Sequence, residues 1–173
     1  AGTFTIEKEF EDMHSKIEHV LTERLGDLGK KIHTARSRND QVLVAMHLYI
    51  KHELGAIKTQ VTALFDLLLS LAEKHQNELM PGYTHLQVAM PSSFGLWFSA
   101  YAESLIDDLY FWQSAHKIAD QNPLGSAAGY GSAFPIDRDF TTKALDFSQL
   151  KINSVAAQMS RGKLEKSTAM ALS

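Results

Sequence analysis

The sequence predicts an all-α protein, a bundle of long helices of which this chain supplies an incomplete part. Two observations favour this class. Stretches that alternate apolar and polar residues, as half-buried strands do, are nearly absent. Apolar residues between Leu43 and Leu71 instead recur at steps of three or four, which is the spacing of one helix face. The resulting helix, expected at 39–77, would be roughly 58 Å long at 1.5 Å per residue. It therefore needs other long helices beside it, from this chain or from partner subunits.

The other elements follow from helical spacing and from glycine and proline. Gly26 is a natural end for a first helix, and Pro91 suits the first turn of a third. Residues 26–32 are expected to form a polar connection, and 80–85 and 122–135 to form loops. The last helix has no stop signal before the sequence ends, so we expect a truncated piece of a longer protein. We expect helices at residues 9–25, 39–77, 92–120, 137–147 and 153–173.

Composition excludes several classes of function. The net charge of −3 offers no basic field for a nucleic acid, so no nucleic-acid partner is expected. The absence of cysteine excludes disulfides, thiolate zinc sites and a cysteine nucleophile. No histidine pair or acidic cluster has the spacing of metal ligands, so we expect no metal. No apolar run approaches the roughly 20 residues that span a bilayer. We therefore expect a cytoplasmic protein with no membrane partner.

The run HTARSRNDQV, residues 33–42, is the strongest functional signal. Arg36 and Arg38 carry forked donors that can grip carboxylates, and Ser37 and Asn39 add short directional donors. If the long helix begins near Asn39, its first N–H groups and the positive end of its dipole also face this spot. The combination suits a ligand with several carboxylates. An ordinary helix cap with solvated charges explains the same residues.

The segment 84–87 is the second candidate. His85 is the side-chain type best suited to proton transfer near neutral pH, and Thr84 and Gln87 can hold a carboxylate or an amide. A solvent-exposed loop histidine is the alternative. Asp12 and His14 form a third candidate near the start of the first helix, where a simple polar helix start is the alternative.

The glycine-rich stretch 122–131 has no Gly-Lys-Ser/Thr and so does not match a phosphate loop. Its small residues indicate a close approach of the backbone, either to a ligand or between helices.

Taken together, these motifs resemble the argininosuccinate lyases of the fumarase and aspartase superfamily, a family that includes the delta-crystallins. The run 33–42 is similar to the first shared region of that family, and the resemblance covers nearly the whole chain in the family's order. Four further segments carry it: EDMH at 11–14 followed by Ile17 and Glu18, GYTHLQ at 82–87 followed by AMP at 89–91, NPLGS at 122–126, and Asp137 with Arg138.

The resemblance implies a fold and a reaction. Residues 1–36 would be the remainder of a small N-terminal helical domain, and 37–173 the first part of the central long-helix bundle. The intact protein, a cytoplasmic homotetramer without a cofactor, would cleave argininosuccinate to arginine and fumarate by β-elimination. The resemblance implies two kinds of site residue. The catalytic residues, which transfer a proton or orient a carboxylate, would be His85 and Thr84. The substrate-binding residues would be Asn39, Arg38, Ser37, Asp12, His14 and Gln87.

One departure from the family pattern limits this expectation. The family's third region, a mobile Gly-Ser-Ser-x-Met-Pro-x-Lys-x-Asn loop that carries the favoured base, does not occur in these 173 residues. The isolated piece is therefore expected to be inactive. The alternatives are a catalytically silent, crystallin-like structural homologue and a simple helical oligomerisation module.

Overall fold

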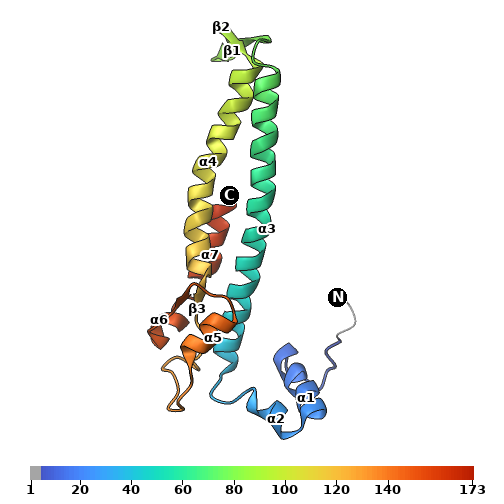
Figure 1. Ribbon diagram of the computed structural model, residues 1–173, viewed down its shortest axis with the longest axis vertical. Coiled ribbons are helices and arrows are strands. Elements are labelled where there is room, and N and C mark those ends of the chain that lie inside the picture. The colour runs from blue at the N-terminus through green and yellow to red at the C-terminus, as the bar shows by residue number, and fades with distance from the viewer. Residues whose placement is uncertain (1–4) are drawn as a thin grey trace. The chain divides into compact units, whose positions relative to one another are not determined.

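The computed structural model describes residues 5–173 and is mainly helical, which confirms the predicted class (Figure 1). Long helices dominate, and the strands are short. The elements in chain order are α1 (Met13–Leu25), α2 (Asp27–Lys31), α3 (Arg38–Lys74), β1 (Leu79–Thr84), β2 (Gln87–Ser93), α4 (Phe94–Ala119), β3 (Gln121–Asn122), α5 (Arg138–Ala144), β4 (Gln149–Leu150), α6 (Ser154–Gln158) and α7 (Lys163–Ala171).

The chain divides into two compact units. The first combines the chain up to Met46 with Gln121–Arg161, and the second combines His47–Asp120 with Gly162–Ser173. This division falls within α3, so the first turns of that helix belong to the first unit. The domain boundary expected near Arg36 from the sequence stays a prediction.

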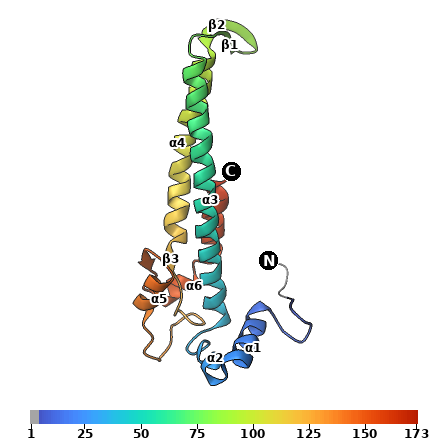
Figure 2. The same cartoon turned by 45° about the vertical axis from the view of Figure 1, so that its right-hand side comes forward.

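The second unit is built on an antiparallel pair of long helices. The part of α3 from His47 onward and α4 run side by side in both ribbon views (Figures 1 and 2). Trp112 Nε1 on α4 donates to the Leu54 carbonyl of α3 at 2.8 Å, and Leu54 is 1% exposed. Near the other end of the pair, a Cβ on Gly95 would lie 2.6 Å from the Cα of Gln76. A residue without a side chain is therefore what permits this close approach.

A hairpin joins the two long helices where a loop was expected at 80–85. Strands β1 and β2 pair in antiparallel register from Leu79↔Ser93 to Thr84↔Gln87. The loop prediction was wrong. Proline and glycine disfavour helix, but the two segments form strands because the backbone N–H and C=O groups of each pair with those of the other. Pro91 lies in β2 rather than in a helical first turn, and Ser93 caps α4 by accepting from Leu96 N at 3.1 Å.

Three further boundaries differ from the sequence prediction. The expected connection 26–32 contains the short helix α2, and the expected single C-terminal helix is two helices, α6 and α7. Gly162 has a φ of 75° between them, a left-handed conformation that interrupts helix and suits glycine. The first helix begins at Met13 rather than at 9, because the Asp12 side chain caps it by accepting from Ser15 N at 2.9 Å.

By length and mean hydropathy, α3 is long and apolar enough to cross a membrane, and the core helix of a bundle meets the same test. Many large apolar side chains of α3 and α4 are exposed in this chain, which agrees with the expectation that other helices lie beside them. Examples are Leu64, Leu67, Trp97, Tyr101, Tyr110 and Phe111.

Candidate functional site

The start of α3 is held by a reciprocal cap. Ser37 Oγ accepts from Asn39 N at 3.2 Å, and Asp40 Oδ1 accepts from Ser37 N at 2.9 Å. The spacing Ser-x-x-Asp is that of a capping box, in which two end donors are satisfied by side chains. Two backbone N–H groups at the start of α3, which the sequence predicted to be available to a ligand, therefore donate to side chains of the chain itself. The hydroxyl hydrogen of Ser37 can still be donated outward.

Asp40 also holds the glycine-rich stretch. Its second oxygen accepts from Gly125 N and Ala127 N, both at 3.0 Å, and its side chain is fully buried. By accepting hydrogen bonds from three backbone N–H groups, this carboxylate joins the start of α3 to a loop 85 residues away, and we call this set of hydrogen bonds the Asp40 joint. In this chain, the close backbone approach expected at 122–131 is an approach to the Asp40 carboxylate. Sequence reasoning missed this role of Asp40, although the Ser-x-x-Asp spacing could have indicated its part in the helix cap.

Arg138 links the same stretch, at Leu124, to residues 151 and 152. Its guanidinium donates to three carbonyls, those of Leu124 at 2.9 Å, Lys151 at 2.7 Å and Ile152 at 3.0 Å. Burial lowers the pKa of Arg138 below its ordinary value, and the charge of Asp40 opposes that shift. Because these donors bind backbone carbonyls, we assign Arg138 a structural role, which is to stabilise the conformation of the loops at Leu124 and at 151–152.

Two of the predicted substrate-binding residues pair with each other. Arg38 Nη1 and Asp12 Oδ1 lie 2.6 Å apart, and each side chain is about one third exposed. The pKa of Asp12 lies below its ordinary value, chiefly because Ser15 N donates to the carboxylate; partial desolvation opposes the shift, and the charges of Arg38 and His14 add to it. His14 is the second residue of α1, two positions after Asp12. A substrate carboxylate approaching Arg38 would thus meet a group that already has an anionic partner.

Asn39 has a partner that the sequence did not indicate. Arg161 Nη2 donates to the Asn39 side-chain Oδ1 at 2.9 Å and to its carbonyl at 3.1 Å. The two residues are 122 positions apart, and both side chains are exposed. Asn39 therefore lies at the surface with its amide oxygen occupied.

The remaining predicted residues lie on the hairpin of the second unit. Thr84 and Gln87 are directly paired across β1 and β2, and His85 and Leu86 form the two-residue turn between them. All four are exposed. His85 and Leu86 have φ values of 49° and 62°, the left-handed conformation that such a turn requires and that non-glycine residues rarely adopt. Because the turn itself requires this conformation, the φ values do not separate a functional His85 from an exposed turn histidine, and its role stays a prediction.

The structure thus forms two groups of predicted residues, one in each unit. The first holds Asp12, His14, Ser37, Arg38 and Asn39 around the starts of α1 and α3, and it offers guanidinium, amide and hydroxyl donors suited to carboxylates. The second is the Thr84–Gln87 turn. Among residues 5–173, no cluster of three or more histidine or acidic side chains could hold a metal ion.

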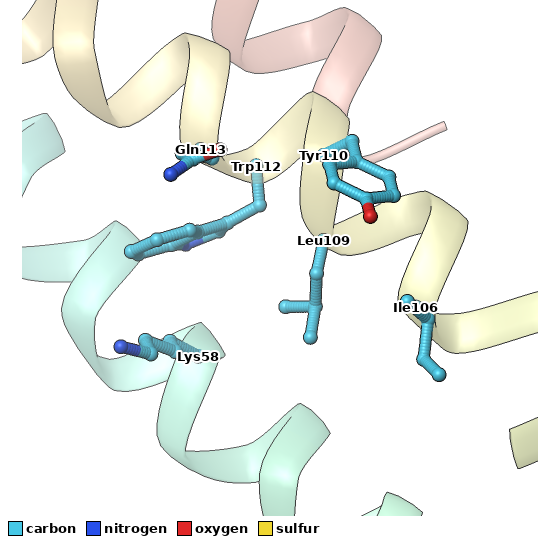
Figure 3. A pocket seen from close by; sticks show the side chains of 6 residues that line it. All are labelled: Lys58, Ile106, Leu109, Tyr110, Trp112 and Gln113. Atoms are coloured by element: carbon cyan, nitrogen blue, oxygen red, sulfur yellow. The ribbon is translucent and has the colours of Figure 1, made fainter. Parts of the chain in front are cut away.

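A separate groove of about 270 Å³ lies on the surface of the helix pair (Figure 3). Lys58 comes from α3 and lies 5.3 Å from the centre of the Trp112 ring, and the other lining residues come from α4. The lining is mainly apolar, with side chains of Ile106, Leu109 and Tyr110. It contains no combination of acid, base and carboxylate-binding groups, so we do not assign it to the reaction.

Comparison with known proteins decides the family. A family model described as Lyase matches residues 1–171. The chain belongs to this lyase family. The structural likeness agrees: a crystal structure of EDDS lyase in complex with formate has a TM-score of 0.84 at 26% identity, covering 89% of this chain and 31% of that one. A fumarate lyase, delta crystallin from Brucella melitensis, bound to cobalt, has a TM-score of 0.68 at 17% identity, which shows the fold alone.

Curated relatives in the lyase family give a finer similarity. The argininosuccinate lyases of Phocaeicola vulgatus and Bacteroides fragilis are each 57% identical over 171 residues, or 99% of this chain. That of Xylella fastidiosa is 49% identical over the same length. The resemblance inferred from the motifs is therefore confirmed. The chain spans about 38% of the length of these relatives.

Proposed function

We propose that this chain is part of an argininosuccinate lyase, which cleaves argininosuccinate to arginine and fumarate. The observation that carries the proposal is the 57% identity to proteins of that name over 99% of the chain. The geometry supports it, because guanidinium, amide and hydroxyl donors gather at the start of α3, where they suit a substrate with several carboxylates.

The reaction proposed for the intact enzyme is a β-elimination. A base removes a proton from the carbon next to a succinyl carboxylate, and the electron pair of that C–H bond delocalises into the carboxylate. The carbanion then forms the double bond of fumarate as the C–N bond breaks, and an acid protonates the departing guanidino nitrogen. Asn39 and Thr84 would donate to the carboxylate as its charge develops, which lowers the barrier by fixed electrostatic stabilisation. His85 would transfer a proton or orient a carboxylate.

The complete site would need more than this chain. The base-bearing loop of the family does not occur in these 173 residues. We infer a cytoplasmic homotetramer in which each site combines regions of several subunits, as the family resemblance implies. The exposed apolar side chains of α3 and α4 support self-association. No cofactor enters this scheme.

Replacement of His85 tests the proposal. In a protein of the relatives' full length, His85→Asn should lower turnover of argininosuccinate, followed by fumarate absorbance, by about 10²- to 10⁴-fold, the usual contribution of a general acid or base. Thermal stability should change little, because His85 is exposed. His19→Asn, which replaces an exposed histidine of α1, is the matched control and should leave turnover unchanged.

Two results would contradict this scheme. Wild-type turnover in His85→Asn would remove the role of His85. Absence of fumarate production by the unsubstituted full-length protein would favour the crystallin-like alternative, a structural homologue without catalysis.

A further inference from the structure

We propose that Arg161 is a positioning residue for Asn39, which fixes the side-chain amide so that its two N–H donors point toward the substrate carboxylate. The inference rests on the proposed function, in which Asn39 contacts substrate. It concerns a residue that neither the sequence motifs nor the family resemblance assigned.

The contact leaves one orientation for the amide. Arg161 Nη2 lies 2.9 Å from Asn39 Oδ1 and 3.1 Å from the Asn39 carbonyl oxygen. A guanidinium has only donors, so the group that faces it must be an acceptor. The amide oxygen of Asn39 therefore turns to Arg161, and its nitrogen, with two hydrogens, turns away. The chemistry of the partner decides this orientation.

Orientation decides what Asn39 can bind. An amide turned the other way would present its oxygen to a carboxylate, and two acceptors repel. An exposed asparagine without a fixed partner samples both orientations, because rotation about its terminal torsion is broad. A fixed charged donor on the oxygen biases the amide to the orientation that favours a carboxylate before substrate arrives. This is preorganisation of a donor for the substrate carboxylate, which is already charged when it binds, so loss of the orientation should act mainly on binding.

Arg161 is anchored to the same framework as Asn39. One turn earlier, Gln158 Nε2 donates to Ser126 Oγ and to the Ala127 carbonyl, both at 3.0 Å. The Ala127 amide in turn donates to Asp40, the neighbour of Asn39. The stretch that carries Arg161 and the helix start that carries Asn39 are thus tied to one loop. This linkage limits the relative movement of the two side chains.

The alternative is that the pair is an ordinary surface contact, since hydrogen bonds between exposed side chains contribute little to stability. A double-mutant cycle separates these readings in a full-length protein. We expect Arg161→Gln to raise KM for argininosuccinate about 10-fold with a smaller change in kcat, because a misoriented amide weakens binding. In an Asn39→Ala background, the same replacement should change KM by less than about 2-fold. Arg24→Gln, an exposed arginine of α1, is the control and should leave KM unchanged.

The orientation itself is measurable without any reaction. In ¹⁵N relaxation of the 173-residue chain, the side-chain amide of Asn39, assigned by its loss in Asn39→Ala, should be rigid in the unsubstituted chain and mobile in Arg161→Gln. Arg161→Lys, which keeps a charged donor, should restore part of the rigidity. Equal mobility in the unsubstituted and Arg161→Gln chains would overturn the proposal, as would independent, multiplicative effects on KM. If the full-length protein produces no fumarate, the proposed function fails, while the relaxation result still decides whether Arg161 positions Asn39.

Discussion

Replacing Asp40 by asparagine should loosen the joint between the start of α3 and the loop that contains Gly125 and Ala127. The Asp40 side chain is fully buried and accepts from three backbone N–H groups at 2.9 to 3.0 Å. Asparagine has nearly the same shape, so the perturbation changes hydrogen bonding and charge with little change in packing. It offers one oxygen and one NH₂ group in place of two oxygens.

The magnitude follows from these three bonds. If the asparagine oxygen keeps the bonds to Gly125 and Ala127, each falls from a charge-assisted to a neutral bond, a loss of about 1 kcal/mol. The NH₂ group then faces the Ser37 N–H, which leaves a buried donor unsatisfied at a cost of about 1–3 kcal/mol. Relief of burying a charge offsets part of this sum. We expect a net destabilisation of the joint of about 2–4 kcal/mol.

Hydrogen exchange at two amides measures this effect directly. At about 1.4 kcal/mol for each factor of ten, protection of the Gly125 and Ala127 N–H groups should fall roughly 30- to 1,000-fold in Asp40→Asn. Asp66→Asn is the matched control, because Asp66 is an exposed residue of the same helix, and it should change protection by less than about 2-fold. A change in Asp40→Asn no larger than in that control would refute the assigned role of the carboxylate.

Two further predictions concern packing and pH. Gly95→Ala should destabilise the α3–α4 pair by about 1–3 kcal/mol in urea unfolding, because its Cβ would lie 2.6 Å from the Cα of Gln76. Gly55→Ala, with nothing within 4 Å of the new Cβ, should instead stabilise α3 by up to about 1 kcal/mol; equal effects of the two substitutions would contradict the packing argument. The Ser15 N–H lowers the folded-state pKa of Asp12 below its unfolded value. The contribution of the Asp12 cap to the stability of α1 should therefore be complete above about pH 4 and decline as the pH falls through the folded-state pKa. Protection of the Ser15 amide from hydrogen exchange should follow that course in the unsubstituted chain and stay constant over the same pH range in Asp12→Asn. An identical profile in both chains would contradict the assigned role of the Asp12 carboxylate.

Local sequence pattern was sufficient for the long helices. The helix predicted at 39–77 is observed at Arg38–Lys74, and the helix predicted at 92–120 is observed at Phe94–Ala119. Their apolar spacing extends over many turns, and such a signal depends on neighbours three and four residues away. The hairpin β1–β2 was not predictable in the same way. Its strands are stabilised by pairing with each other, and no periodic pattern within either strand reports that partner.

The sequence by itself determined the class, the long helices, the family resemblance and the residue types suited to binding carboxylates. Its motifs, beginning with the run 33–42, are local, and the chemistry of each side chain is fixed by its identity. Only the tertiary structure decided the partners: Arg38 with Asp12, Asp40 with the loop at Gly125, and Arg161 with Asn39. These contacts join residues 26, 85 and 122 positions apart, so they depend on how the chain returns on itself. A single sequence specifies which groups can donate and accept, and the fold determines which of them meet.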